Sequence, residues 1–232
     1  NISEYDIIKV EEKMKDIILY HGSKSGIVGD IRPESRETCD FGKGFYMGTE
    51  PMQAKSLVTR FDNPQIYTVR LRLSEIPESK ILRLDDDREW LYTILACRGA
   101  MSAKNIPSAR KLLADLKKYD VIIGKIADDS MKEALSAFYE NSLTDEGLTV
   151  CLQKADYGLQ YVAKTEFACS KIDILSEKRL FGREKQDAIS YGITTRNRCI
   201  GIVEKMQTEF SDRGEYMHDI IQRETKKGKG RG

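Results

Sequence analysis

The two stretches that decide the fold of this chain are Leu19-Tyr-His-Gly-Ser23 and Asp40-Phe-Gly-Lys-Gly-Phe-Tyr46. The first closes a short apolar run over residues 17–20, which is typical of a strand that ends in a tight turn. Gly22 in that turn would let a ligand approach the backbone, whose N–H and C=O groups can pair with a carboxamide. The second places two glycines around Lys43, but it lacks the G-x-x-x-x-G-K-S/T spacing of a phosphate-binding loop. It predicts a tight loop that leads into an aromatic pair.

The remaining chain mixes strands and helices without a regular β-α-β rhythm. Further strands are predicted at residues 66–73, 80–84, 120–124, 159–164 and 171–175. Helices are predicted at residues 1–16, 87–97, 108–118, 129–139 and 144–154, with one more starting at residues 49–51. This order favours an α+β protein over a doubly wound parallel sheet.

A change in composition near residue 178 predicts a boundary. Beyond it the chain becomes more basic, and residues 196–225 carry apolar side chains at helical spacing. Residues 226–232 consist of lysine, arginine and glycine, for which no packing is expected. We therefore expect a core over residues 1–178 and a helical appendage over residues 179–232 that ends in a disordered basic tail. A purely stabilising role and a partner-binding role both stay open for the appendage.

Composition narrows the class of protein. A chain of 232 residues has room for one good-sized domain plus an appendage. The net charge of +1 provides no steering field for nucleic acid or an anionic membrane, although RNA as a substrate stays open. No apolar run approaches the ~18 residues that a membrane span needs, and residues 1–15 are too polar for a signal peptide. We expect no membrane association.

The five cysteines are widely spread and contain no C-x-x-C pair, which favours reduced and mostly buried thiols. With only His21 and His218 as imidazole ligands, we expect no metal site. We expect a cytoplasmic protein, or one delivered into the cytosol of a host or target cell.

Taken together, in this order and about 20 residues apart, the two stretches resemble the diphtheria-toxin and poly(ADP-ribose) polymerase branch of the ADP-ribosyltransferases. In that branch a His-Gly turn binds the ribose and nicotinamide amide of NAD+, and a Phe-Gly-x-Gly-(Ile/Phe)-Tyr segment supplies a tyrosine that stacks on nicotinamide. The longer stretch over residues 39–54 resembles the bacterial DUF3990 family, whose uncharacterised members are placed in the same branch. The resemblance runs from about residue 17 to residue 175.

This resemblance implies the ADP-ribosyltransferase fold, a split and mostly antiparallel β-sandwich with peripheral helices. NAD+ would lie in the cleft between the two half-sheets as a consumed co-substrate. His21 would hydrogen-bond the ribose, Gly22 and Ser23 would bind the carboxamide, and Tyr46 would stack on the nicotinamide ring. The other positions that the resemblance assigns to dinucleotide binding are Phe41, Gly42, Lys43, Gly44 and Phe45.

Gln160 marks a departure from the family pattern. In the poly(ADP-ribose) polymerases a Glu opens a late strand of the form Glu-Tyr-Ile-Val-Tyr-Asp, and here the matching stretch begins Gln160-Tyr161. Cleavage of the nicotinamide glycosidic bond builds positive charge on the ribose, which a carboxylate would stabilise. The Gln160 amide can accept a hydrogen bond from the 2′-OH but brings no negative charge. The missing Glu favours transfer of a single ADP-ribose over chain elongation.

Two acids are candidates for the missing charge. Asp129 follows the strand predicted to end at residue 124, where ligand-facing side chains are expected, although capping of the next helix is its alternative role. Glu166 would share the face of Gln160 only if their strand ran on, and its alternative role is a solvent-facing acid. We take Gln160, Tyr46, His21 and Asp129 as the catalytic set.

The expected function is a mono-ADP-ribosyltransferase, a bacterial toxin or effector that modifies a macromolecular acceptor. A protein side chain, with a Ser or Thr hydroxyl favoured, is preferred to nucleic acid because the core is nearly neutral. An antitoxin or immunity protein is a conceivable partner. Three alternatives stay open: modification of RNA or DNA bases, an NAD+ glycohydrolase that uses water as acceptor, and an inactive NAD-binding module.

Overall fold

One sheet of seven strands organises the protein, in the order β4-β5-β6-β2-β1-β3-β7. The computed structural model describes residues 16–99, 106–127, 132–155 and 158–229. The strands are β1 (Ile17–Ser23), β2 (Phe45–Gly48), β3 (Gln65–Leu71), β4 (Ile81–Leu84), β5 (Val121–Lys125), β6 (Leu159–Ala163) and β7 (Ile172–Arg179). Strands β4 and β5 are parallel, and every other neighbouring pair is antiparallel. The predicted α+β class is confirmed.

The sheet is nearly divided between β1 and β2. These two strands share the single residue pair Tyr20↔Gly48, whereas β1 and β3 pair along their whole length from Ile17↔Leu71 to Ser23↔Gln65. Strands β4, β5, β6 and β2 therefore form one half of the sheet, and β1, β3 and β7 form the other. The described strands form a continuous sheet rather than two separately packed ones, with a weak joint in its middle.

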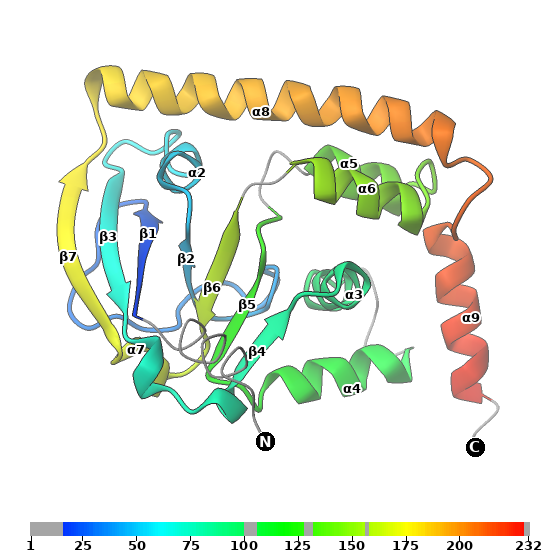
Figure 1. Ribbon diagram of the computed structural model, residues 1–232, viewed down its shortest axis with the longest axis horizontal. Coiled ribbons are helices and arrows are strands. Elements are labelled where there is room, and N and C mark those ends of the chain that lie inside the picture. Colours follow the sequence, from blue (N-terminus) through cyan, green and yellow to red (C-terminus); the bar gives the residue numbers. More distant parts are fainter. Residues whose placement is uncertain (1–15, 100–105, 128–131, 156–157, 230–232) are drawn as a thin grey trace, which may run out of the picture.

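Helices cover the sheet and extend beyond it (Figure 1). They are α2 (Pro51–Ser56), α3 (Asp87–Cys97), α4 (Pro107–Leu116), α5 (Lys132–Tyr139), α6 (Asp145–Ala155), α7 (Glu166–Cys169), α8 (Gly182–Glu209) and α9 (Met217–Lys229), with short 3-10 turns at Leu73–Glu75 and Glu78–Lys80. The helix predicted at residues 1–16 lies almost wholly outside the described residues.

Two apolar clusters occupy the two faces of the sheet. Because side chains alternate along a strand, Leu19 and Tyr161 point into one cluster while Val162 points into the other. The larger cluster contains Trp90 of α3 and packs beneath α3, α4, α5 and α6. Trp90 and Tyr161 are both buried in these clusters.

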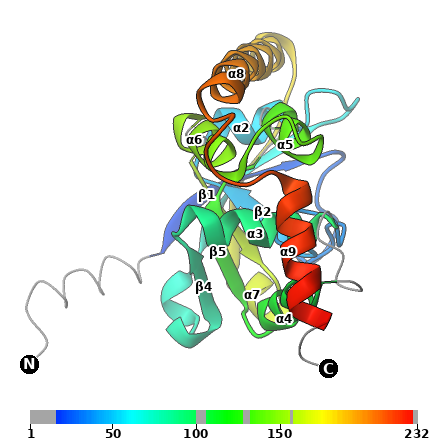
Figure 2. The same cartoon turned by 90° about the vertical axis from the view of Figure 1, so that its right-hand side faces the viewer.

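The C-terminal segment packs on the core. Helix α8 runs along one side of the molecule over α2, α5 and α6, and α9 descends beside α4 (Figures 1 and 2). The two helices bury side chains in the larger cluster: Cys199 and Val203 from α8, and Met217 and Ile220 from α9. The predicted boundary at residue 178 falls inside β7. Helix α9 runs to Lys229 and so includes the first residues of the segment for which no packing is expected.

Candidate functional site

A cavity of about 120 Å³ opens where β1 and β2 separate. Four predicted site residues line it: His21 and Gly22 from β1, Tyr46 from β2, and Gln160 from β6. Its other lining residues are Tyr20, Met47, Gly48, Gln53, Ala54, Leu57 and Ile126. The fold thus brings together predicted site residues from distant parts of the sequence, since His21 and Gln160 are 139 positions apart.

Helix α2 forms one wall of the cavity. It lies directly on the backbone of β1, because a Cβ atom added at Gly22 would come within 2.5 Å of the Ala54 carbonyl oxygen. Pro51 occupies the first turn of α2, as the sequence predicts. Gly22 is therefore required for close packing between a strand and a helix, in addition to any approach of a ligand.

His21 is fixed by a backbone hydrogen bond and by a ring contact. Its Nδ1 lies 2.7 Å from the carbonyl oxygen of Tyr46, and its ring stacks on Phe45 with a centroid distance of 4.2 Å. A carbonyl can only accept, so Nδ1 is assigned the proton and Nε2 is left as an acceptor. Burial lowers the pKa of His21 below its ordinary 6.5, against an opposing effect of the bond to Tyr46. The imidazole is accordingly neutral at pH 7.

Tyr46 is locked against the glycine-rich loop. Its hydroxyl donates to the Gly42 carbonyl at 2.7 Å and accepts from the Phe41 N–H at 3.0 Å. Gly42 adopts φ of 74°, a left-handed conformation that favours glycine. Burial, reinforced by the negative charge of Asp40, raises the pKa of Tyr46, which keeps the phenol neutral. With its hydroxyl engaged, Tyr46 offers a ligand its aromatic ring.

Gln160 is buried, and both N–H groups of its side-chain amide donate hydrogen bonds. The two N–H groups point at the Asp40 carboxylate and at the Lys125 carbonyl, each at 3.0 Å. No described residue donates to Oε1, so this oxygen is the polar atom that Gln160 presents to the cavity. In register, Gln160 pairs with Gly48 and lies on the same face as Tyr46.

Asp40 and Arg98 are site residues that sequence reasoning missed. One oxygen of Asp40 accepts from Arg98 Nε at 2.8 Å and from Nη2 at 2.5 Å, and its other oxygen accepts from Gln160. The side chain of Asp40 is only 12% exposed. The available signal was an acidic residue directly before Phe-Gly-x-Gly, but the pairing with Arg98 and Gln160 depends on segments far away in the sequence.

The loop residues assigned to NAD+ do not line the cavity. Phe41 is fully buried in the larger cluster, and Lys43 is exposed and faces a separate cavity of about 500 Å³ with Lys164. Gly44 allows close contact with β6, since a Cβ there would lie 2.4 Å from Val162. Phe45 supports the ring of His21. The loop therefore holds Tyr46 and His21 in place instead of forming a floor at this cavity.

Ser23 also lies apart from the cavity lining. Its hydroxyl donates to the Gly26 carbonyl at 3.0 Å and accepts from the Gly26 N–H at 3.1 Å. These bonds close the turn after β1, a local use that serine hydroxyls commonly have. The expected bond from Ser23 to a carboxamide would require this turn to open.

Neither candidate acid is placed beside Gln160 by the structure. Asp129 lies outside the described residues. Glu166 is exposed, opens α7 and follows the end of β6 that is remote from Gln160. Its solvent-facing alternative therefore applies, because the Thr165 cap ends the strand before it can return a side chain to the cavity.

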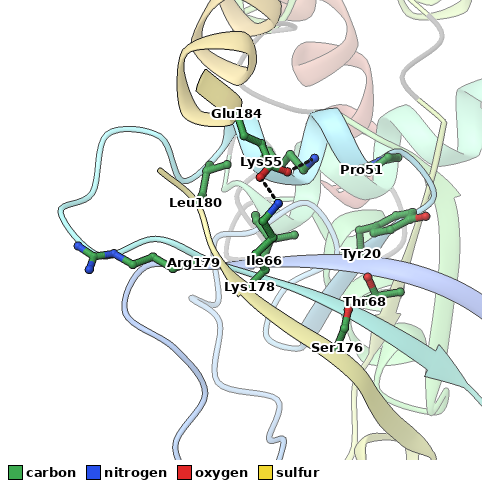
Figure 3. Close-up of a pocket in the computed structure, with 10 residues that line it drawn as sticks. All are labelled: Tyr20, Pro51, Lys55, Ile66, Thr68, Ser176, Lys178, Arg179, Leu180 and Glu184. Carbon is green, nitrogen blue, oxygen red and sulfur yellow. Dashed lines mark ion pairs between the residues drawn. The ribbon is translucent and has the colours of Figure 1, made fainter. Parts of the chain in front are cut away.

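A neighbouring pocket of about 140 Å³ shares Tyr20 with the cavity and is drawn in Figure 3. Glu184 at the start of α8 pairs there with Lys55 of α2 at 2.7 Å and with Lys178 of β7 at 2.5 Å. Arg179 extends away from these groups (Figure 3). These ion pairs fasten α8 to the wall of the cavity.

Over the described ranges, no group of three or more His, Cys, Asp and Glu side chains could hold a metal ion. No helix among those residues is both long and apolar enough to cross a membrane. None of the five cysteines, all of which lie in the described ranges, forms a disulfide, and all except the half-exposed Cys39 are buried.

Comparison with known proteins yields one match. The model of the family described as "Protein of unknown function (DUF3990)" matches residues 17–174, which is more than half of the chain and ends before α8. No curated protein and no solved structure matches the chain.

Proposed function

The chain belongs to the DUF3990 family, and from this premise and the cavity at the sheet joint we propose that it is a mono-ADP-ribosyltransferase. It would cleave NAD+ and transfer ADP-ribose to a protein side chain, with a Ser or Thr hydroxyl favoured. The observation that carries the proposal is the convergence of His21, Tyr46 and Gln160 around one cavity. These are the residues that the sequence resemblance assigns to NAD+.

The sheet supports the corresponding fold assignment. An ADP-ribosyltransferase fold is split between two half-sheets, and here β1 and β2 are joined by the single pair Tyr20↔Gly48. The cavity lies at that joint. Its volume of about 120 Å³ is well below the roughly 300–1,000 Å³ of pockets that enclose whole ligands. We propose that it takes the nicotinamide end, while the rest of NAD+ lies outside it.

Each lining group has a definite chemical role in this proposal. The Tyr46 ring stacks on the pyridinium, and the neutral His21 offers Nε2 to a ribose hydroxyl. Gln160 Oε1 accepts the 2′-OH and so orients the ribose. The C1′–N bond then breaks, and its electron pair passes to the pyridinium nitrogen, so nicotinamide departs neutral without needing a proton. The acceptor oxygen bonds to C1′ and releases its own proton to solvent water.

The net charge of the chain is the basis for the proposed class of ADP-ribose acceptor. With a net charge of +1, the chain lacks the field that attracts nucleic acid, which leaves a protein as the preferred acceptor. Five cysteines that form no disulfide suit action in a cytosol, either that of the producing cell or that of a cell into which the protein is delivered.

The test uses NAD+ labelled on its adenylate half, purified protein, and cell lysate with or without nuclease. His21→Ala is the test variant, and His218→Ala is the matched control because His218 is exposed on α9 and far from the cavity lining. We expect label on protein and free nicotinamide with the wild type and with His218→Ala, and neither with His21→Ala.

Each other outcome changes the assignment. Nuclease-sensitive label would identify nucleic acid as the acceptor, and nicotinamide without label would identify an NAD+ glycohydrolase. No nicotinamide release under any condition would overturn the transferase proposal and leave an NAD-binding module.

A further inference from the structure

A buried carboxylate stands directly behind Gln160. Oδ2 of Asp40 lies 3.0 Å from the Gln160 amide nitrogen, although 120 positions separate the two residues. Asp40 and Gln160 are 9% and 6% exposed. Glu166, by contrast, lies beyond the far end of β6. Asp40 therefore places a carboxylate, itself paired with Arg98, directly behind the position where the family pattern has lost one.

The hydrogen bonds of Gln160 determine which way its amide points. Both of its close partners, the Asp40 carboxylate and the Lys125 carbonyl, can only accept. A flipped amide would place its oxygen against two other oxygens, which is electrostatically unfavourable. The nitrogen must therefore point inward, and the oxygen is left for the cavity.

The partners of Gln160 are themselves held in place. The Lys125 carbonyl also accepts from Trp90 Nε1 at 2.8 Å, and Trp90 is fully buried. Arg98 donates hydrogen bonds to the other oxygen of Asp40 and to the Ala127 carbonyl, the latter at 2.7 Å. This network connects α3, β5 and β6 behind one wall of the cavity. Such second contacts fix a functional side chain more firmly than its own rotamer preference does.

We propose that Asp40 is a positioning residue, which holds the Gln160 amide with its oxygen toward the cavity and polarises that oxygen. Asp40 and Gln160 would together serve the function of the single Glu in the polymerase pattern, which is to orient and stabilise the ribose. The carboxylate receives one amide N–H, and the polarised amide passes electron density to Oε1, where a ribose hydroxyl would bind. This inference rests on the proposed function, since it assigns Gln160 a ribose to orient.

The test is a double-substitution cycle. Asp40→Asn keeps the shape of the side chain, but its one oxygen remains with Arg98 and its amide donor now faces the Gln160 donor. We expect nicotinamide release to fall by roughly 10–100-fold, as for other residues that orient a functional group. Gln160→Glu alone would place two carboxylates about 3.0 Å apart and is also expected to lose activity.

The double variant Asp40→Asn/Gln160→Glu distinguishes positioning from general structural support. The amide introduced at position 40 could then donate to the carboxylate introduced at position 160, so the double variant should release nicotinamide faster than Asp40→Asn. Recovery should be partial, because the Lys125 carbonyl still faces one oxygen of residue 160. A double variant no faster than Asp40→Asn would overturn the inference. Asp145→Asn is the matched control, a buried carboxylate that pairs with Arg88 away from the cavity, and it should retain the wild-type rate.

Unfolding measurements on the wild type, the two single variants and the double variant separate this inference from the proposed function. If Asp40 orients residue 160, the double variant should be more stable than the sum of the two single effects predicts. Additive effects would overturn the inference even if the wild type cleaves NAD+. A wild type that does not cleave NAD+ would overturn the proposed function, and the coupling measured by unfolding would still decide the orientation of Gln160.

Discussion

At the scale of single residues, the site is built from side chains held in one state. The imidazole of His21 is neutral and donates to Tyr46, while the hydroxyl of Tyr46 is engaged by the loop. Gln160 is restricted to one amide orientation by Asp40 and Lys125. These contacts hold the three side chains in single orientations, which is the preorganisation that the proposed reaction requires.

The state of His21 predicts a pH dependence of stability. The pKa of His21 in the folded protein is below the 6.5 of an unperturbed histidine. At pH values between these two pKa values, the unfolded chain therefore binds more protons than the folded chain does. Stability should therefore decrease as pH falls from 7.5 through 6.5. Urea unfolding at pH 7.5 and pH 5.5 measures this, with His21→Asn as the comparison because its amide can still donate to the Tyr46 carbonyl. An equal loss of stability in both proteins would contradict the prediction.

At the scale of elements, the close contact between β1 and α2 forms the cavity wall. Helix α2 has only six residues and its N-cap, Glu50, makes no side-chain capping bond. The hydroxyl of Thr49, the residue before this N-cap, accepts from the N–H of Leu159 in β6. Tertiary contacts rather than local capping therefore hold this short helix, as expected for an element too short to be stable alone.

Gly22→Ala tests this contact. The added Cβ would come within 2.5 Å of the Ala54 carbonyl oxygen, so α2 would have to move away from β1. We expect a loss of about 1–3 kcal/mol in the free energy of unfolding, the usual cost of overpacking, together with reduced nicotinamide release. Gly201→Ala in α8 is the control, since open space surrounds it and alanine favours a helix by up to about 1 kcal/mol. If Gly22→Ala leaves the free energy of unfolding unchanged, α2 adjusts freely to the added Cβ.

At the scale of the whole molecule, the C-terminal helices complete the core that carries the site. Helix α8 spans 28 residues and is fastened by Glu184 to α2 and β7 near the cavity. Cys199, Val203 and Met206 of α8 are buried in the larger cluster. The family match ends at residue 174, yet the packing continues through α9.

Truncation tests whether these helices are separable. A chain ending at Arg179 would expose the apolar surface that α8 and α9 cover, so we expect it to lose cooperative thermal unfolding. A chain ending at Lys226 keeps every buried residue of α9 among those described and should unfold like the full chain. If the chain ending at Arg179 unfolds cooperatively at the same temperature as the full chain, residues 180–232 are an independent appendage.

The sequence by itself determined the α+β class, most strand and helix positions, and four lining residues at three widely separated places. These follow from local periodicity and from motifs that are short and contiguous. It missed β2, because four residues are too few to display a strand pattern, and it extended β3 to Leu73, which instead starts a 3-10 turn. Only the tertiary structure decided that Asp40 is the acid found against Gln160 among the described residues, a place for which the sequence suggested Asp129 or Glu166. The physical reason is that strand order and register bring distant residues into contact, and no local pattern in the chain encodes that pairing.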